Sequence, residues 1–124
     1  MLSIGVYSKI EEYEKLGYIP FSASNVRPIW YVEGFNEPRI APPEQLISYD
    51  MEKNPDNRKE YIRIYNEYLN SVPDAVFLQY IESDRKYVLI CSQKWDEISI
   101  QRDVLTHHIN QRFHILLKEP QRKE

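Results

Sequence analysis

The sequence predicts a single α/β domain in which helices flank a small, mostly parallel sheet. Three observations lead to this fold class. Residues 86–91 form a nearly continuous run of β-favouring residues, which is typical of a strand buried on both faces of a sheet. Residues 58–72 repeat apolar side chains every three to four positions, as an amphipathic helix does. A chain of 124 residues is also long enough to bury one core of its own.

The first three elements follow one another closely. Residues 2–7 alternate apolar and small side chains and predict a strand. Residues 10–16 place apolar side chains at three-residue spacing among acidic ones, which predicts a short helix that ends at Gly17. Residues 18–22 predict a second strand, and Pro20 favours a place for it at the edge of the sheet.

Residues 23–43 break the regular pattern with several prolines and a glycine. Aromatic and basic residues are scattered through this segment, among them Phe35 and Arg39. Long irregular segments in compact domains are usually either functional or disordered, and the aromatic content favours order here. The next residues, 43–49, predict a brief helix with proline in its first turn.

The second half of the chain carries the strongest periodicity. After the helix at 58–72, a further helix is predicted from Pro73 and Asp74 to Ile81. The central strand at 86–91 follows, and the pattern returns to helical spacing from Ile100 to Ile109.

A short final strand is predicted at 113–117. The alternation of strands and helices favours parallel pairing, because parallel neighbours need long crossover connections. We expect one α/β domain over residues 1–119, followed by a charged tail at 120–124 that frays.

Composition argues against several classes of function. A net charge of −3 gives no broad phosphate-binding face, so nucleic acid is not a favoured partner. The single cysteine, Cys91, allows neither an intrachain disulfide nor a thiolate metal cluster. The sequence has no signal-peptide pattern, no long apolar run and no lipidation motif. We therefore expect a cytoplasmic protein that does not associate with membranes.

The ten tyrosines have two interpretations that the sequence leaves open. Tyrosine is enriched in interfaces, so they could form an adhesive surface for a protein partner. Alternatively, their rings fill the core while their hydroxyls reach polar partners.

Metal and nucleotide motifs are missing from the sequence. His107 and His108 are neighbours on a predicted helix and diverge by about 100°, so they cannot chelate one ion together. The third histidine, His114, completes no known metal spacing. Three glycines do not form a glycine-rich phosphate loop. We expect no metal and no cofactor, and we assign no catalytic residue.

The junction after the central strand is the most favourable place for a ligand site. In open α/β sheets the ligand crevice lies outside the carboxyl ends of the strands, where the next helix begins. Residues 92–97 have loop chemistry there, and Arg102 is expected in the first turn of the following helix, where backbone N–H groups also favour an anion. The candidate ligand-binding residues are Arg27, Trp30, Tyr31, Cys91, Lys94 and Arg102.

Each candidate has a chemical role and a structural alternative. Arg27 and Trp30 could form a cationic, stacking wall, or the aromatic residues could simply cover one end of the core. Arg102 could hold an anion or cap the core. Cys91, at the end of an apolar strand, is more typical of a buried and inert thiol than of a nucleophile.

Several segments resemble a known family. They are residues 7–9 after the first strand, 27–31, Leu46 after 41–42, the tyrosine-rich stretch 61–69, and above all 89–94, which reads Leu-Ile-Cys-Ser-Gln-Lys. On these residues the chain is similar to compact bacterial and phage members of the domain-of-unknown-function family 488. In that family the central strand ends in a cysteine, an aromatic-Glu-Lys loop follows, and the next helix opens with Cys-His-Arg.

The resemblance also marks where this chain departs from the family. The Cys-His-Arg positions read Ile100, Gln101 and Arg102 here, and Gln93 stands where the family has glutamate. If the family's pocket uses the lost cysteine and histidine, the resemblance implies that this chain has given up that chemistry.

Two classes of function follow. The first is a small binding or interaction protein with a degenerate pocket and a tyrosine-rich surface for a protein partner. The resemblance adds a phage or mobile-element origin, with a host or defence factor as the target. The second is a small enzyme or sensor for a nucleotide-like or phosphorylated ligand at the carboxyl edge of the sheet. Missing acid, base and nucleophile candidates favour the first.

Overall fold

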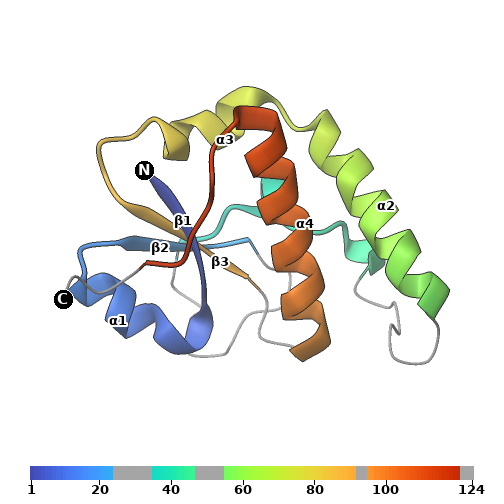
Figure 1. Cartoon of the computed structure of the whole chain (residues 1–124), viewed down its shortest axis with the longest axis horizontal. Coiled ribbons are helices and arrows are strands. Elements are labelled where there is room, and N and C mark those ends of the chain that lie inside the picture. The colour runs from blue at the N-terminus through green and yellow to red at the C-terminus, as the bar shows by residue number, and fades with distance from the viewer. Residues whose placement is uncertain (24–34, 47–54, 92–94, 121–124) are drawn as a thin grey trace.

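The computed structural model describes residues 1–23, 35–46, 55–91 and 95–120, which form one mixed α/β domain. In this part of the chain, a three-stranded parallel sheet is accompanied by four α-helices (Figure 1). The predicted fold class is confirmed.

The sheet has the predicted central strand at its middle. Strands β1 (Leu2–Val6) and β2 (Ile19–Ser22) pair in parallel with opposite sides of β3 (Tyr87–Cys91), which gives the order β1-β3-β2. Residues 88–91 of β3 are buried, as expected for a strand covered on both faces. Pro20 lies in an edge strand, also as predicted.

The helices follow the sequence periodicity. Helix α1 (Ile10–Lys15) follows a 3-10 turn at Tyr7–Lys9 and ends before Gly17, whose φ of 87° reverses the chain. The other three are α2 (Pro55–Ser71), α3 (Asp74–Ile81) and α4 (Trp95–Phe113).

Two 3-10 turns, at Pro38–Ile40 and Glu44–Leu46, lie in the segment that leads towards α2. The second falls within the helix expected at 43–49, of which residues 47–49 lie outside the described residues. None of the helices in the described part is long and apolar enough to cross a membrane.

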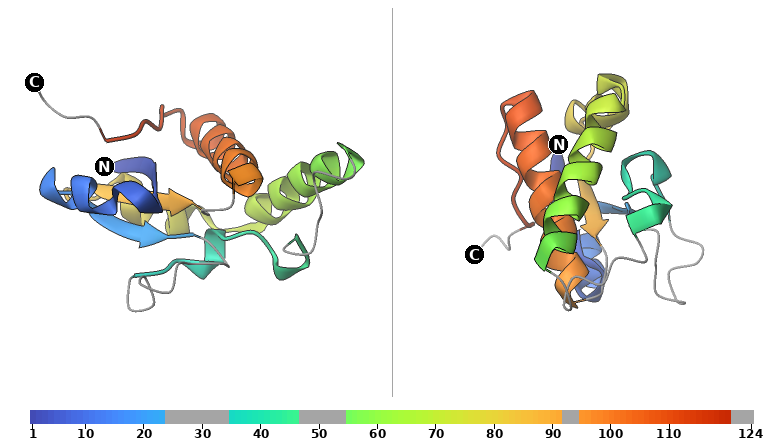
Figure 2. Two further views of the ribbon diagram at one scale, coloured as in Figure 1. Left: turned by 90° about the horizontal axis from the view of Figure 1, so that it is seen from below. Right: turned by 90° about the vertical axis from the view of Figure 1, so that its right-hand side faces the viewer.

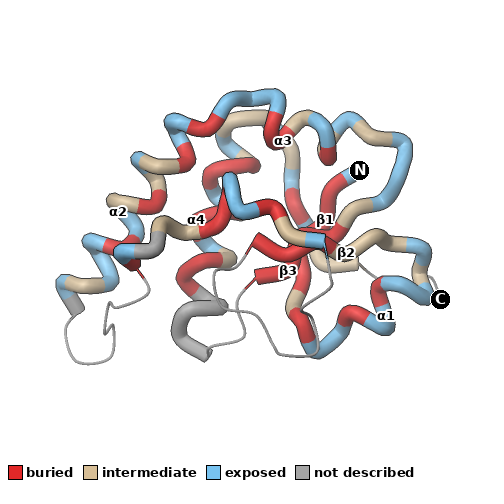
Figure 3. Tube along the Cα trace, turned by 180° about the vertical axis from the view of Figure 1, so that it is seen from behind, coloured by how far each residue is buried: buried red, intermediate tan, exposed pale blue. Residues whose placement is uncertain are grey.

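The two faces of the sheet bury different clusters, because successive strand residues point to opposite sides. Leu89 and Cys91 join the large cluster formed with α2, α3 and α4, whereas Val88 and Ile90 join a smaller cluster around Tyr13 of α1. Figure 3 shows the resulting pattern, with buried positions concentrated on the strands and recurring along the helices. Helices α2 and α4 lie side by side over the larger core (Figure 2).

Most of the described tyrosines lie in the core, as one of the two interpretations expects. Five are buried, three are half-buried, and Tyr31 and Tyr49 lie outside the described residues. The buried five are Tyr7, Tyr13, Tyr61, Tyr65 and Tyr80. A tyrosine-rich partner surface stays a prediction.

Two predictions about the C-terminal third are wrong. Helix α4 begins at Trp95, so 95–97 are helical rather than loop, and the acidic pair Asp96-Glu97 has the composition of a first helical turn. Residues 115–120, here named the C-terminal strap, form no strand. The strap makes one backbone hydrogen bond to β1, from Ile4 N–H to the Lys118 carbonyl at 3.1 Å, which is too little for a ladder.

Candidate functional site

The carboxyl edge of the sheet is occupied by buried side chains in the described part of the chain. Tyr7 follows β1 directly, Ser22 ends β2, and Cys91 ends β3, where it lies opposite Val6. The hydroxyls of Tyr7 and Ser22 are hydrogen-bonded to each other in a buried position. This edge is therefore closed by packing at the ends of all three strands.

Cys91 has no exposed surface. Burial raises the pKa of its thiol to about 12, and the positive charge of Arg102 acts in the opposite direction without cancelling the effect. Because the thiolate is the nucleophilic form of cysteine, a thiol that stays protonated at neutral pH is inert. The surroundings of Cys91 therefore favour a buried, inert thiol over a nucleophile.

The sequence led us to expect Arg102 in the first turn of its helix, and this prediction is wrong. It is the eighth residue of α4 and lies about 10 Å along the axis from Trp95. The backbone N–H groups of the helix N-terminus therefore cannot share an anion with its guanidinium. Instead, Arg102 Nη1 pairs with Glu119 Oε1 of the C-terminal strap at 2.7 Å.

Gln101, which the resemblance to family 488 aligns with that family's histidine, is 1% exposed. Its Nε2 donates to the Ala23 carbonyl at 2.6 Å, which ties α4 to the end of β2. A neutral amide in this position fixes structure and offers no proton-transfer chemistry near neutral pH.

The other predicted site residues cannot be compared with the structure. Arg27, Trp30, Tyr31 and Lys94 lie outside the described residues, so the expected approach of Trp30 to Arg102 stays a prediction.

A second cluster, which the sequence did not reveal, lies beside β2. Residues 35–37 run alongside the end of that strand: Ser22 N–H donates to the Phe35 carbonyl at 2.9 Å, and Glu37 N–H donates to the Ser22 carbonyl at 2.7 Å. The 3-10 turn at Pro38–Ile40 then folds Arg39 back over Glu37.

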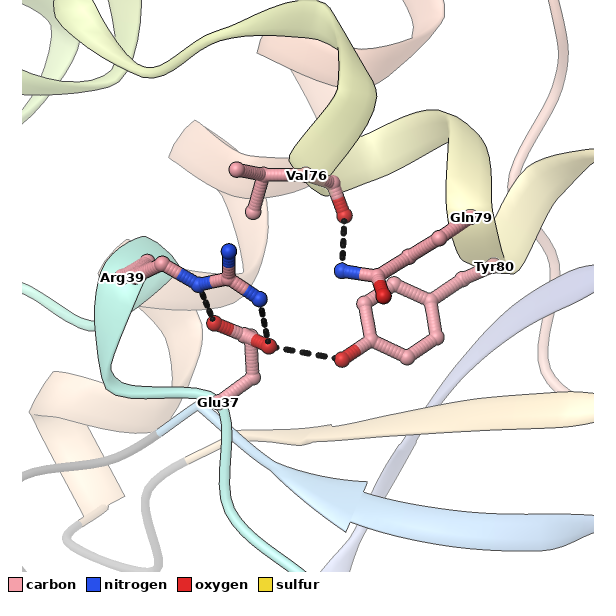
Figure 4. Close-up of polar contacts among 5 residues, drawn as sticks. All are labelled: Glu37, Arg39, Val76, Gln79 and Tyr80. Atoms are coloured by element: carbon pink, nitrogen blue, oxygen red, sulfur yellow. Dashed lines mark hydrogen bonds and ion pairs between the residues drawn. The ribbon is translucent and has the colours of Figure 1, made fainter.

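The carboxylate of Glu37 is the centre of this cluster (Figure 4). It is 3% exposed and accepts two hydrogen bonds from Arg39, from Nε to Oε1 at 2.5 Å and from Nη2 to Oε2 at 2.8 Å. Tyr80 of α3 donates its hydroxyl to Oε2 at 2.7 Å. A buried carboxylate is tolerated when it is paired and hydrogen-bonded in this way.

The pKa values of Glu37 and Tyr80 are shifted in opposite directions. Burial alone would raise the pKa of Glu37, but the hydrogen bonds from Arg39 and Tyr80 and the charge of Arg39 outweigh it and lower the pKa below 4.5. Burial and the neighbouring carboxylate raise the pKa of Tyr80 well above 10. At neutral pH Glu37 is thus ionised and Tyr80 protonated, which fits the hydrogen bond that the Tyr80 hydroxyl donates to the carboxylate.

Two side chains that contact this cluster, Arg39 and Phe35, are exposed to solvent. The side chain of Arg39 is 57% exposed, and Phe35 is 52% exposed. The ring of Phe35 lies 5.9 Å from that of Phe21 and 6.4 Å from that of Tyr80, centroid to centroid. Phe21 and Tyr80 are stacked at 4.2 Å. Phe35 and Arg39, named here the Phe35–Arg39 surface, are therefore supported by one buried aromatic and ionic base.

A polar groove of about 470 Å³ lies between α2 and α4. Its lining residues are Asn66, Asn70, His107, His108, Gln111 and Arg112. The guanidinium of Arg112 is already engaged, since it donates to the carbonyls of Leu69 and Val72 and to Asp74. Within the described residues, no group of three or more His, Cys, Asp or Glu side chains is placed to hold a metal ion.

The fold and this cluster define a small parallel α/β domain with an exposed arginine fixed by a buried carboxylate. The chain matches no family model, no curated protein and no solved structure. The resemblance to family 488 accordingly stays a prediction.

Proposed function

We propose that the chain is a small interaction domain that binds a partner protein through the Phe35–Arg39 surface. The partner segment carries a carboxylate, which Arg39 binds, next to an apolar side chain, which packs on Phe35. One observation supports this proposal above the others: a carboxylate that is 3% exposed is used to hold an arginine that is 57% exposed.

The chemistry of the two residues suits recognition. Glu37 engages Nε and Nη2 of Arg39, so Nη1 can still donate to an incoming carboxylate. An arginine already held in one geometry loses less conformational entropy when a partner binds. Aromatic residues and arginine are also the side chains most enriched among interface residues that dominate binding energy.

A random peptide library displayed on phage tests the proposal, because it samples many candidate partner segments at once. Peptides selected on the wild-type chain should converge on an acidic residue beside an apolar one. Phe35→Ser and Arg39→Gln should each weaken a selected peptide by roughly 30-fold, which corresponds to about 2 kcal/mol. Fluorescence anisotropy with a labelled peptide measures the dissociation constants.

Two matched variants on α2 serve as controls. Arg63 is 55% exposed and paired with Glu60 and Glu67, and Ile62 is 38% exposed. Arg63→Gln and Ile62→Ser should leave peptide affinity unchanged. Selected peptides without an acidic consensus, or equal binding by all four variants, would contradict the proposal.

Binding of a phosphorylated ligand at the carboxyl edge is the second candidate function. The observation in its favour is that Arg102 and Lys9, which lies in the turn after β1, both pair with one carboxylate, that of Glu119, at 2.7 Å and 4.0 Å. Two cations therefore lie near the carboxyl end of β1. Thermal unfolding with a panel of nucleotides and phosphosugars tests it: a stabilisation of several degrees that disappears in Arg102→Ala is the expected result. Action on a host or defence factor, with a phage or mobile-element origin, stays a prediction from the resemblance.

A further inference from the structure

The C-terminal strap runs back from the end of α4 towards Arg102. Helix α4 ends at Phe113, and His114 adopts a φ of 54°, a left-handed conformation that reverses the chain (Figure 1). From residue 114, five extended residues reach about 17 Å, and the twelve helical residues back to Arg102 cover about 18 Å. The strap therefore has the length needed to bring Glu119 level with Arg102.

Glu119 lies between two cations contributed by different elements. Its Oε1 is 2.7 Å from Arg102 Nη1 on α4, and its Oε2 is 4.0 Å from Lys9 Nζ in the turn before α1. Glu12 and Tyr13 belong to the same neighbourhood, since Glu119, Arg102 and Glu12 all act electrostatically on the Tyr13 hydroxyl. The carboxylate of Glu119 thus occupies the place where an external oxyanion would meet Arg102 and Lys9.

Beyond Leu117 the strap is held by few contacts and is therefore easy to release. Leu117 is buried in the large core cluster and Ile115 packs against that cluster, so the first half of the strap is anchored. The second half is tied by Ile4 N–H to the Lys118 carbonyl at 3.1 Å and by the ion pair of Glu119 with Arg102. A segment without regular structure or buried apolar side chains opens at much lower free energy than the core.

We propose that Arg102 and Lys9 form an oxyanion site that Glu119 occupies as a displaceable internal ligand. A phosphate monoester is the class of external ligand, because it carries up to two negative charges and three acceptor oxygens where a carboxylate carries one charge and two. Binding of the phosphate releases the strap from Arg102 and from β1. This inference rests on the second candidate function, deepens it by naming its regulation, and is independent of the Phe35–Arg39 surface.

Titration of the ¹⁵N-labelled chain with inorganic phosphate, at neutral pH and constant ionic strength set with chloride, tests the site. Glu119→Gln should bind phosphate about tenfold more tightly than the wild-type chain if the strap occupies the site about nine-tenths of the time. Arg102→Gln and Lys9→Gln should weaken or abolish binding. Glu67→Gln is the matched control, because it removes one carboxylate from an arginine that keeps a second partner, Glu60.

Hydrogen exchange at the Ile4 amide reports the strap directly, because that amide donates to Lys118. Its exchange should accelerate severalfold in Glu119→Gln and in the wild-type chain with phosphate. The Ile19 amide, which donates to the Lys86 carbonyl at the opposite side of the sheet, should not change.

Three results would overturn the inference. Phosphate binding that depends on Arg102 but is equal in wild type and Glu119→Gln would remove the internal ligand and leave the second candidate function intact. An Ile4 amide whose exchange is insensitive to Glu119→Gln would likewise show that Glu119 does not hold the strap. No phosphate binding by any variant would remove both the site and the second candidate function.

Discussion

At the scale of single residues, Glu37 is the one carboxylate among the side chains that the structure describes as buried. Its charge is compensated by three hydrogen bonds from two side chains, and Tyr80 lies 43 residues away in sequence. Arg39 supplies the opposite charge from a largely exposed position, whereas the Tyr80 hydroxyl is buried with the carboxylate. Loss of the Tyr80 hydroxyl would therefore remove a donor that solvent is poorly placed to replace.

We expect Tyr80→Phe to destabilise the domain by about 2 kcal/mol, because a buried charged acceptor loses one donor. Urea unfolding at neutral pH measures this difference. Tyr68→Phe, at a half-buried tyrosine on α2, is the control and should change stability by less than about 0.5 kcal/mol.

Tyr80→Phe should also change how the stability of the domain depends on pH in the acid range. The folded-state pKa of Glu37 lies below 4.5, so its contribution to stability is present above that pH and is lost as the pH falls through the folded pKa. Tyr80→Phe should raise the folded pKa of Glu37 and reduce the stability lost between neutral pH and the acid range. Identical acid dependence of the two proteins would contradict the assigned hydrogen bond.

Two glycines should respond differently to alanine. A Cβ on Gly5 would lie 2.5–2.6 Å from the ring and hydroxyl of Tyr13, which is itself buried and accepts from Val6 N–H. Gly5→Ala should therefore cost upward of about 2 kcal/mol through overpacking. Gly17 has free space around it but a φ of 87°, so Gly17→Ala should cost only about 1 kcal/mol. Thermal unfolding ranks the two, and a reversed order would contradict this packing.

Sequence reasoning at this scale succeeded where the cause is local. Gly17 as a helix stop follows from the conformational freedom of glycine alone. The Glu37 cluster could not be predicted, because its members come from a loop and a helix that only the fold brings together. The Glu37-Pro38-Arg39 sequence was the one available signal, since proline after an acid favours the tight turn that returns Arg39.

At the scale of elements, Arg112 joins three helices. From α4 it donates to the carbonyls of Leu69 and Val72 at the end of α2 and to Asp74 at the start of α3. Its guanidinium also lies 5.1 Å from the ring centroid of Phe77. These contacts satisfy carbonyls that a helix C-terminus otherwise leaves unpaired.

We expect Arg112→Met to destabilise the domain by about 3 kcal/mol, because the apolar stem is kept while several charged hydrogen bonds are lost. Arg63→Met on the exposed face of α2 should change stability by less than about 1 kcal/mol, since its ion pairs are at the surface. Chemical denaturation of both variants makes the comparison. A similar loss of stability in the two variants would show that the hydrogen bonds of Arg112 to α2 and α3 do not stabilise the domain.

The errors at this scale have a common physical origin. Residues 113–117 have the composition of a strand, but the backbone hydrogen bond that β1 makes to this end of the chain runs from Ile4 N–H to the Lys118 carbonyl, just beyond them, and the segment forms no strand. The start of α4 was placed five residues too late because its apolar periodicity begins at Ile100, while its first turn contains the acidic pair Asp96-Glu97, which also suits a loop. Composition and periodicity describe which side is buried, and they do not report where hydrogen bonding begins.

At the scale of the whole molecule, the parallel sheet and its central strand were predictable. The β3 run is the most apolar short segment, and a chain that alternates strands with helices places such a run in the middle of a parallel sheet. The Phe35–Arg39 surface was not predictable in the same way. The residues expected to bind ligand were chosen for the carboxyl edge, where Tyr7, Ser22 and Cys91 are buried and Arg102 pairs with Glu119, whereas Arg39 lies beside β2.

The most direct test is a map of backbone amide chemical shifts of the chain titrated with a peptide selected on it. We predict the largest changes in chemical shift at residues 35–40. Smaller changes are expected in α3 around Tyr80, because its hydroxyl binds Glu37 and its ring lies near that of Phe35. Changes centred on His107 and Gln111, in the groove between α2 and α4, would contradict the Phe35–Arg39 surface as the binding site.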